Sequence, residues 1–217
     1  MASLDIGPSV AENALFERLA ALPENHRSLV AIAGPPGAGK SALADRLTVR
    51  LNRQAENRAA TLPVEGFLLD EVILGLKGRQ HRKGAPDTFD GGGLSHLIRR
   101  LKSNLEEEIA APVYDRNLDL TRAGARLIRR ATDLVLIEGN YLLSDTLPWA
   151  PLYGLFDFTV MVTADEKTLR RRLETVLPQY GLSADETSDK IDRIDMPNAR
   201  FVQSSAMAPD FTLSLEG

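Results

Sequence analysis

The chain has 217 residues, of which 43% are hydrophobic and 26% are charged, and its formal net charge is -4. This composition is that of an ordinary soluble globular protein of about one domain, and it excludes an intrinsically disordered chain. The acidic balance gives no basic field for binding nucleic acid, and the lack of cysteine excludes disulfides, thiolate catalysis and cysteine-based zinc sites.

The N-terminal residues 1–16 carry acidic side chains and no basic segment followed by an apolar run, so we expect no signal peptide. No stretch approaches the roughly 18 apolar residues of a membrane span. We therefore expect a cytoplasmic protein that binds neither a membrane nor nucleic acid. The sequence does not indicate an oligomeric state, and it leaves a homodimer open.

Strand and helix patterns alternate through the first half of the chain. The spacing of apolar residues predicts a helix, a buried strand, a helix, a strand and a short helix, over Ala11–Leu22, Ser28–Ala33, Ser41–Asn52, Ala59–Val64 and Leu68–Leu76 respectively. The polar, glycine-rich stretch that follows, Lys77–Gly93, is predicted to be a loop. Loops of this kind commonly carry function.

The second half continues the alternation. Its patterns predict a helix, an extended segment, two buried strands and an edge strand, over Leu94–Leu105, Ile109–Tyr114, Asp133–Ile137, Phe158–Val162 and Phe211–Leu215. Two capping boxes, Thr163 with Glu166 and Ser183 with Glu186, predict helix starts. Alternating helices and apolar strands predict one α/β domain, residues 1–217, whose mostly parallel sheet is covered on both faces.

A phosphate-binding loop is the strongest chemical signal in the sequence. Gly34–Ser41, GPPGAGKS, matches GxxxxGK[ST] in full between a predicted strand and a predicted helix, the context that this loop requires. Its glycines let backbone N–H groups face phosphate oxygens, and the helix N-terminus adds favourable partial charge. We expect Lys40 to bridge the β- and γ-phosphates of ATP and the Ser41 hydroxyl to ligate Mg²⁺. A glycine turn with an incidental lysine is the alternative.

The residues expected to line the nucleotide from this loop are Gly34, Pro35, Pro36, Gly37, Ala38, Gly39, Lys40, Ser41 and Ala42. Two glutamates follow strands that would end beside the loop. Glu138 ends the apolar run DLVLI, and Glu65 follows the other early strand. Ligands gather at the carboxyl ends of parallel strands, so one acid could organise Mg²⁺ and the other accept the proton of an attacking hydroxyl. The alternative is that both are solvated strand-end side chains.

Several segments, in order, resemble the P-loop kinases that include pantothenate kinase, uridine kinase and phosphoribulokinase. Besides the glycine loop they are PVEGFLLD, KGAPDTFD, APVYDR, LIEGNYLL and DMPNAR, at 63–70, 83–90, 111–116, 136–143 and 195–200. Within that family the chain resembles the bacterial group described as fructose transport system, or fructokinase-like, kinases. The resemblance implies a three-layer P-loop fold with a small helical lid over about 163–195.

The resemblance also implies a role for each matching residue. It implies catalytic roles for Lys40, Glu65, Arg170 and Arg172, nucleotide contacts for Arg171 and Asn198, Mg²⁺ ligation by Ser41 and Glu138, and acceptor contacts for Lys83, Asp87, Asp90, Tyr114 and Arg116. A solvated helix face is the alternative interpretation of the three arginines. The chain departs from the family at two positions, with Glu65 where aspartate is usual and Leu68 where histidine is common in near relatives.

The function predicted from these residues is transfer of the γ-phosphate of ATP to a hydroxyl of a small molecule, with Mg²⁺. The resemblance favours a sugar or similar polyol as the acceptor over pantothenate or a nucleoside. A regulatory P-loop NTPase that hydrolyses ATP without a small acceptor is the alternative from another class, and it is distinguished by ADP release that does not depend on an acceptor.

Overall fold

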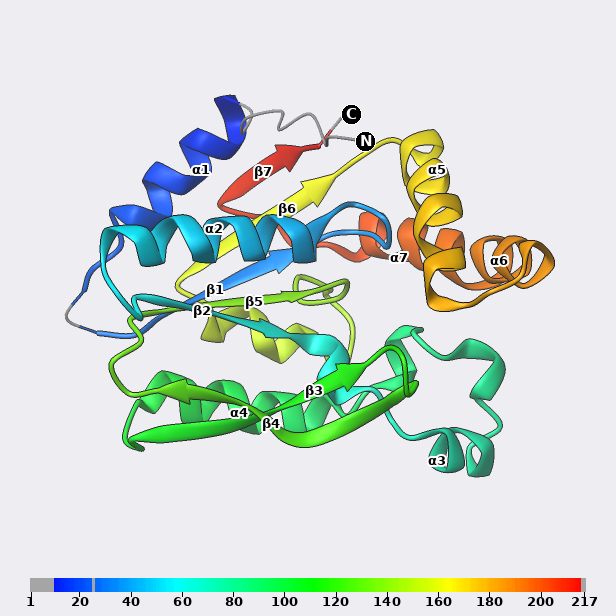
Figure 1. Ribbon diagram of the computed structural model, residues 1–217, viewed down its shortest axis with the longest axis horizontal. Helices are drawn as coiled ribbons and strands as arrows, with labels where there is room; N and C mark the ends of the chain where they lie inside the picture. Colours follow the sequence, from blue (N-terminus) through cyan, green and yellow to red (C-terminus); the bar gives the residue numbers. More distant parts are fainter. Residues whose placement is uncertain (1–9, 25, 216–217) are drawn as a thin grey trace.

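The structure of the protein, a computed structural model, describes residues 10–24 and 26–215 (Figure 1). Most of the N-terminal segment in which no signal peptide is expected therefore lies outside the described residues. Of the helices in the described ranges, none combines the length and the apolar character that crossing a bilayer requires.

A five-stranded sheet forms the centre of the fold, in the order β2-β5-β1-β6-β7 (Figure 1). Its strands are β1 Ser28–Ala33, β2 Ala59–Pro63, β5 Leu134–Gly139, β6 Phe158–Thr163 and β7 Phe211–Ser214. Every neighbouring pair in this sheet is parallel. The apolar runs of β1 and β5 are buried along their whole length, as expected for strands covered on both faces. The predicted edge strand β7 does lie at the edge.

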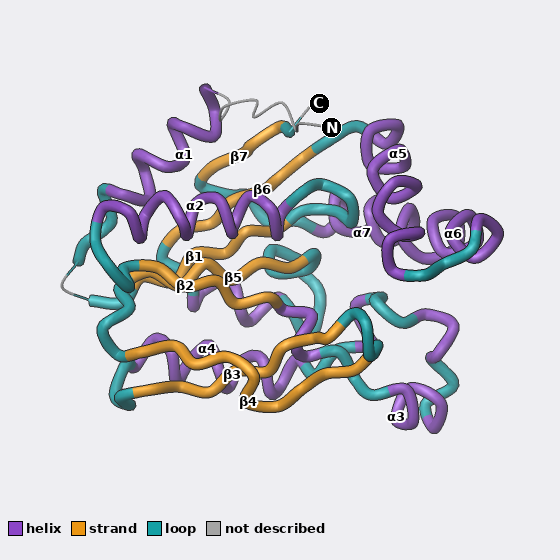
Figure 2. Tube along the Cα trace, in the orientation of Figure 1, coloured by secondary structure: helices purple, strands orange, loops and turns teal. Residues whose placement is uncertain are grey.

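Helices and a β-hairpin cover the two faces of this sheet (Figure 2). Val30 and Ile32 of β1 enter one core cluster, and the alternate residues Leu29 and Ala31 enter the other. Helices α1, α2 and α5 pack on the first cluster, and α4 with the hairpin β3–β4 packs on the second. Their bounds are α1 Val10–Ala20, α2 Lys40–Gln54, α4 Gly91–Ser103, α5 Glu166–Val176, β3 Glu108–Asp115 and β4 Leu120–Arg129. The predicted three-layer α/β fold is confirmed.

The remaining elements lie at the carboxyl ends of the parallel strands or connect the layers. The α-helices are α3 Glu71–Leu76, α6 Ala184–Lys190 and α7 Met196–Ser205. Short 3-10 segments are η1 Val64–Phe67, η2 Gln80–Arg82, η3 Pro86–Thr88, η4 Ala150–Leu155 and η5 Leu177–Tyr180. A π-helical turn, η6 Ile191–Asp195, joins α6 directly to α7. Strand β4 and helix α7 were not predicted from the sequence.

Helix starts agree only in part with the sequence patterns. Ser183 and Glu186 form the predicted capping box of α6. The capping box predicted at Thr163 is wrong, because Thr163 still belongs to β6 and pairs with β7. Helix α5 is capped instead by Asp165, whose Oδ1 accepts from the Thr168 N–H at 2.8 Å. The loop predicted over 77–93 ends early, because Asp90 caps α4 through the Gly93 N–H at 2.8 Å.

A buried arginine ties the second layer to the sheet. Arg27, just before β1, is 4% exposed. Its guanidinium donates to the carbonyl of Thr132 at 3.0 Å and to that of Leu101 at 3.2 Å, and also to the Arg129 carbonyl. These carbonyls belong to the segment before β5 and to the ends of α4 and β4. One side chain thus joins the start of β1 to the end of α4 and to the connection between β4 and β5.

Replacing this side chain should lower stability without touching the phosphate-binding loop. We expect Arg27→Met to reduce the free energy of unfolding by about 3 kcal/mol, because charge-assisted hydrogen bonds to buried carbonyls are lost. Urea titration of wild type and variant measures the change. The exposed Arg18→Met is the matched control and should lie within about 0.5 kcal/mol of wild type. Equal unfolding midpoints for all three proteins would contradict this role.

Candidate active site

Parallel strands bring three predicted site segments to one edge of the sheet. The strands β1, β2 and β5 run in the same direction and end on the same side (Figure 1). The glycine loop follows β1, Glu65 follows β2, and Glu138 lies near the end of β5. Because β5 lies between the other two, Glu138 is in register with Ile32 of β1 and Pro63 of β2. The predicted clustering at the carboxyl ends follows directly from this strand order.

Two glycines of the phosphate-binding loop are packed too closely for side chains. A Cβ on Gly34 would lie 2.4 Å from the Val162 carbonyl oxygen, and one on Gly37 would lie 2.9 Å from the Leu169 carbonyl oxygen. Gly37 and Gly39 also have φ values of +78° and +91°, which favour glycine. The loop therefore forms a tight backbone cradle before the start of α2, with glycine at its most closely packed positions. Such a cradle suits the oxygen atoms of a bound phosphate.

Lys40 and Ser41 open helix α2 and turn toward Glu138. The Lys40 ammonium donates to the Pro35 carbonyl at 2.9 Å, and the Ser41 hydroxyl donates to Glu138 Oε1 at 3.1 Å. Burial lowers the pKa of Lys40, and the nearby Glu138 carboxylate opposes that shift. Burial likewise raises the pKa of Glu138 to about 6, with Lys40 opposing. A cation or a phosphate bound here would meet one ammonium, one hydroxyl and one buried carboxylate.

A metal ion in this site would need ligands from outside the protein. Within residues 10–24 and 26–215 no three acidic or histidine side chains are grouped closely enough to hold an ion. Ser41 and Glu138 could supply two oxygen ligands. That donor set fits Mg²⁺, which keeps several waters and takes phosphate oxygens as further ligands.

Glu65 forms an ion pair with a residue that is distant in sequence. The Arg116 guanidinium, in the turn between β3 and β4, donates to Glu65 Oε2. The same guanidinium lies 4.9 Å from the ring centroid of Tyr180, a cation–π distance. Tyr180 ends η5, so this contact joins the hairpin to the helical segment after β6. Sequence analysis missed Tyr180, because a lone aromatic residue before a glycine carries no pattern.

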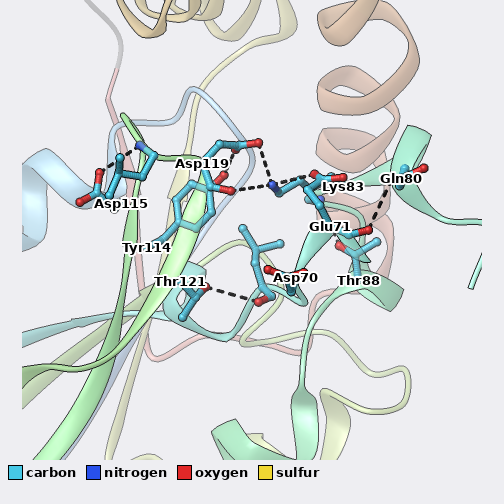
Figure 3. Close-up of polar contacts among 12 residues, drawn as sticks. Asp70, Glu71, Gln80, Lys83, Thr88, Tyr114, Asp115, Asp119 and Thr121 are labelled. Atoms are coloured by element: carbon cyan, nitrogen blue, oxygen red, sulfur yellow. Dashed lines mark hydrogen bonds and ion pairs between the residues drawn. The ribbon is translucent and has the colours of Figure 1, made fainter. Parts of the chain in front are cut away.

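The predicted acceptor loop is anchored at Gly84 and by ion pairs. The Gly84 carbonyl accepts from the Tyr141 hydroxyl at 2.7 Å and from Asn198 Nδ2 at 3.3 Å. Asp87 pairs with Arg79 and Arg82. Predicted acceptor residues Lys83 and Tyr114 lie together near the tip of the hairpin (Figure 3), and Asp90 lies at the start of α4.

The three arginines of α5 differ in their surroundings. Arg172 donates to the Ala38 carbonyl of the glycine loop at 3.3 Å and to the Leu215 carbonyl at 2.7 Å. Arg170 pairs with Asp192 on η6 instead. Arg171 lies between them on the same helix. The structure therefore brings Arg172 to the glycine loop and leaves Arg170 in an ion pair at the surface.

A buried acid near the site was also missed. Asp195, in the π-helical turn η6, is 6% exposed, and both of its carboxylate oxygens accept from Lys190 Nζ at 2.9 Å. Burial raises the pKa of Asp195, and Lys190 opposes the shift; the charges of Glu65 and Lys40 also reach it. Asp195 begins the segment DMPNAR, but nothing in that pattern distinguishes it from an exposed acid. π-Helical turns of this kind often occur at functional sites.

The parallel sheet and the tight backbone cradle before the start of α2 define a P-loop nucleotide-binding protein. The sequence model described as the phosphoribulokinase / uridine kinase family matches residues 29–212. The chain belongs to that family.

Individual relatives agree with this assignment. A Schizosaccharomyces pombe protein with the provisional name of uridine kinase is 30% identical over 200 residues, which are 88% of this chain and 85% of the relative. Pantothenate kinase of Streptomyces avermitilis is 31% identical over 150 residues, 66% of this chain but 45% of that protein. A crystal structure from Silicibacter sp. TM1040, provisionally named a fructose transport system kinase, has a TM-score of 0.83 and 34% identity, and the match covers 95% of this chain and 99% of that one. The chain is therefore a kinase, an ATP-dependent phosphotransferase that acts on a hydroxyl group.

The two arginines with different partners should respond differently to substitution. We expect Arg172→Met to lower kcat by about tenfold or more, because a guanidinium near the phosphates stabilises charge during transfer. Arg170→Met should change kcat by less than about twofold, because its exposed pair with Asp192 contributes little. Steady-state kinetics measure both, and thermal midpoints verify folding. Equal losses of kcat in the two variants would show that the contact of Arg172 with the glycine loop does not give it a special part in catalysis.

Proposed function

We propose that the chain transfers the γ-phosphoryl group of ATP to a hydroxyl of a neutral sugar or similar polyol. The observation that carries this proposal is the charge pairing around the predicted acceptor segments. Five basic side chains there contact carboxylates: Arg79 and Arg82 contact Asp87, Lys83 contacts Glu71 and Asp119, Arg116 contacts Glu65, and Arg122 contacts Asp115. The formal charges of these groups cancel.

This pairing bears on the class of acceptor. A carboxylate or phosphate on the acceptor is normally bound by a cation that is not already neutralised. A neutral polyol instead needs hydrogen-bond donors and acceptors, and paired ionic side chains supply both. The name of the Silicibacter relative points to the same class of acceptor. Relatives named for uridine and pantothenate define the two other classes to be tested.

On this proposal the nucleotide lies along residues 34–42. The backbone cradle and Lys40 hold the phosphates, and Arg172 adds positive charge from α5. Mg²⁺ would be held by Ser41 and Glu138 and would neutralise phosphate charge. The helical segment over about 163–195 would act as the lid. Transfer then depends mainly on positioning and charge stabilisation.

Glu65 is the proposed general base. Its Oε2 is bonded to Arg116, and within the described residues its Oε1 has no hydrogen-bond partner. That oxygen is available for the acceptor hydroxyl, from which it would take the proton as the oxygen attacks phosphorus. Arg116 remains as the counter-charge of the carboxylate. Tyr114, Asp87, Asp90 and Lys83 stay predicted acceptor-side residues, and Arg171 and Asn198 stay predicted nucleotide-side residues.

The class of acceptor is decided by a panel of substrates. We expect ADP release to rise above the acceptor-free rate with neutral hexoses or pentoses such as fructose. Pantothenate and sugar phosphates, which carry uncompensated negative charge, should give little stimulation, and uridine serves as the neutral nucleoside. Coupled ADP detection, followed by mass spectrometry of the phosphorylated product, makes the measurement. Stimulation by pantothenate or uridine alone would refute the sugar proposal while leaving the kinase assignment intact.

The base is tested with the acceptor found in that panel. Glu65→Gln keeps the size and polarity of the side chain but removes its basicity, so kcat should fall by about 10²- to 10⁴-fold. The dissociation constant of ATP should barely change. Glu65→Asp restores the usual family residue and should retain more activity than Glu65→Gln. The exposed Glu56→Gln is the control and should match wild type. Near wild-type turnover of Glu65→Gln would exclude Glu65 as the base.

A further inference from the structure

Lys83 forms ion pairs with two segments that are far apart in the sequence (Figure 3). Its Nζ lies 2.8 Å from Glu71 Oε1, at the start of α3. The same nitrogen lies 2.9 Å from Asp119 Oδ2 and 3.1 Å from the Asp119 carbonyl oxygen. An ammonium group has three N–H donors, and these three acceptors account for all of them. Lys83 would have to give up one of these bonds to contact an acceptor molecule.

Asp119 also engages the second predicted acceptor residue. The Tyr114 hydroxyl donates to Asp119 Oδ1, and the Lys83 ammonium lies 5.5 Å from the Tyr114 ring centroid. Burial, with a further contribution from Asp119, raises the pKa of Tyr114 to about 12, so the phenol keeps its proton near neutral pH. Figure 3 shows Lys83 and the Tyr114 hydroxyl turned toward Asp119. Both polar tips are thus directed to one carboxylate.

The two sides of this contact are held differently. On the loop side, the carbonyl of Gly84, next to Lys83, is fixed by Tyr141 and Asn198. On the hairpin side, Asp119 is 64% exposed at its side chain and adopts a left-handed backbone with φ of 52°. The turn that contains Asp119 also carries Arg116, the partner of Glu65. The loop side is therefore anchored to the protein interior, and the exposed turn is the side that needs support.

We infer that Lys83 and Asp119 form a clamp that holds turn 116–119 against loop 83–90, so that both are positioning residues for acceptor binding. The clamp keeps Arg116 opposite Glu65, where the acceptor hydroxyl must arrive. The inference rests on the proposed function in that Glu65 marks the acceptor site. It assigns Lys83 a role through Asp119 in place of a direct contact to the acceptor.

The two possible roles of Lys83 predict different effects on acceptor binding when Asp119 is substituted. If Lys83 acts through the clamp, removing either partner loosens the same turn, and the two substitutions have similar, non-additive effects. If Lys83 contacts the acceptor directly, substituting Asp119 frees an ammonium donor, and acceptor binding should be unchanged or tighter. The Asp119 variant therefore decides between them.

The variants are chosen to preserve the backbone. Asn tolerates a positive φ, so Asp119→Asn keeps the turn while removing the charge and one acceptor oxygen. Lys83→Met removes the ammonium and keeps the apolar stem. Lys102→Met is the matched control, because Lys102 Nζ likewise donates to a carbonyl, that of Leu155 at 2.8 Å, and to a carboxylate, Asp157 Oδ1 at 3.1 Å, away from the site.

Two measurements are made on the full chain. Hydrogen exchange by mass spectrometry follows the peptides that cover 83–90 and 114–122, and it needs no acceptor. Steady-state kinetics give KM for ATP and for the acceptor that the wild type uses best in the panel above. If that acceptor is a nucleoside, the sugar proposal fails and the clamp is tested with the nucleoside. Failure of the sugar proposal can therefore be distinguished from failure of the clamp.

We expect Lys83→Met, Asp119→Asn and the double variant each to raise the acceptor KM by about tenfold, the range of a charge-assisted hydrogen bond, with ATP KM unchanged. Exchange at 114–122 should be faster in all three, and Lys102→Met should match wild type in both assays. Unchanged exchange at 114–122 in Lys83→Met would show that there is no clamp. A raised acceptor KM in Lys83→Met with an unchanged or lowered KM in Asp119→Asn would instead assign Lys83 a direct contact to the acceptor.

Discussion

The close packing of the glycine loop against β6 and α5 is the constraint on which the nucleotide side of the protein depends. Backbone carbonyl groups of Val162 and Leu169 occupy the space that side chains at Gly34 and Gly37 would need. The loop therefore packs directly on the backbone of the strand and helix behind it. Because α5 follows β6 after a short turn, the same packing fixes the helix whose Arg172 reaches the loop carbonyls. The phosphate-binding cradle and its arginine are thus joined by close packing and by hydrogen bonds to loop carbonyls.

The acceptor side is held in a different way. The Lys83–Asp119 ion pair joins its loop to the hairpin turn, and further pairs lie at the loop, within the hairpin and between the turn and Glu65. Ion pairs between half-exposed side chains contribute little each, because water screens them. Two carbonyl groups tie the loop to the interior: that of Gly84 accepts from Tyr141 and Asn198, and that of Pro86 accepts from the buried Trp149 at 3.2 Å. Side chains in such pairs can exchange an ionic partner for a hydroxyl group of a bound molecule with little loss of free energy. On the proposed function, the nucleotide thus meets a backbone cradle fixed by close packing, and the acceptor meets side chains that are paired by charge.

The sequence predicted the parts of this arrangement that are local or periodic. The glycine loop and the two strand-end glutamates follow from short patterns and from the geometry of parallel strands. The partners of Arg116 and Lys83 could not be predicted, because Tyr180 and Asp119 approach them only after the hairpin and the helical segment fold over the sheet. Strand β4 was missed because its exposed, arginine-rich residues show no apolar alternation. The capping box at Thr163 failed for a related reason: pairing with Ser214 keeps Thr163 extended, so the helix begins only after the chain leaves the sheet.

Hairpin β3–β4 is a two-stranded sheet of its own, joined to the five-stranded sheet by no strand pairing. Its tip carries Arg116 and Asp119, while the residues that face the nucleotide belong to the larger sheet and its helices. Substitutions at the tip therefore leave the strand pairing beside the glycine loop intact. On the proposed function, acceptor preference could therefore differ between proteins of this fold that share the same glycine loop and parallel sheet.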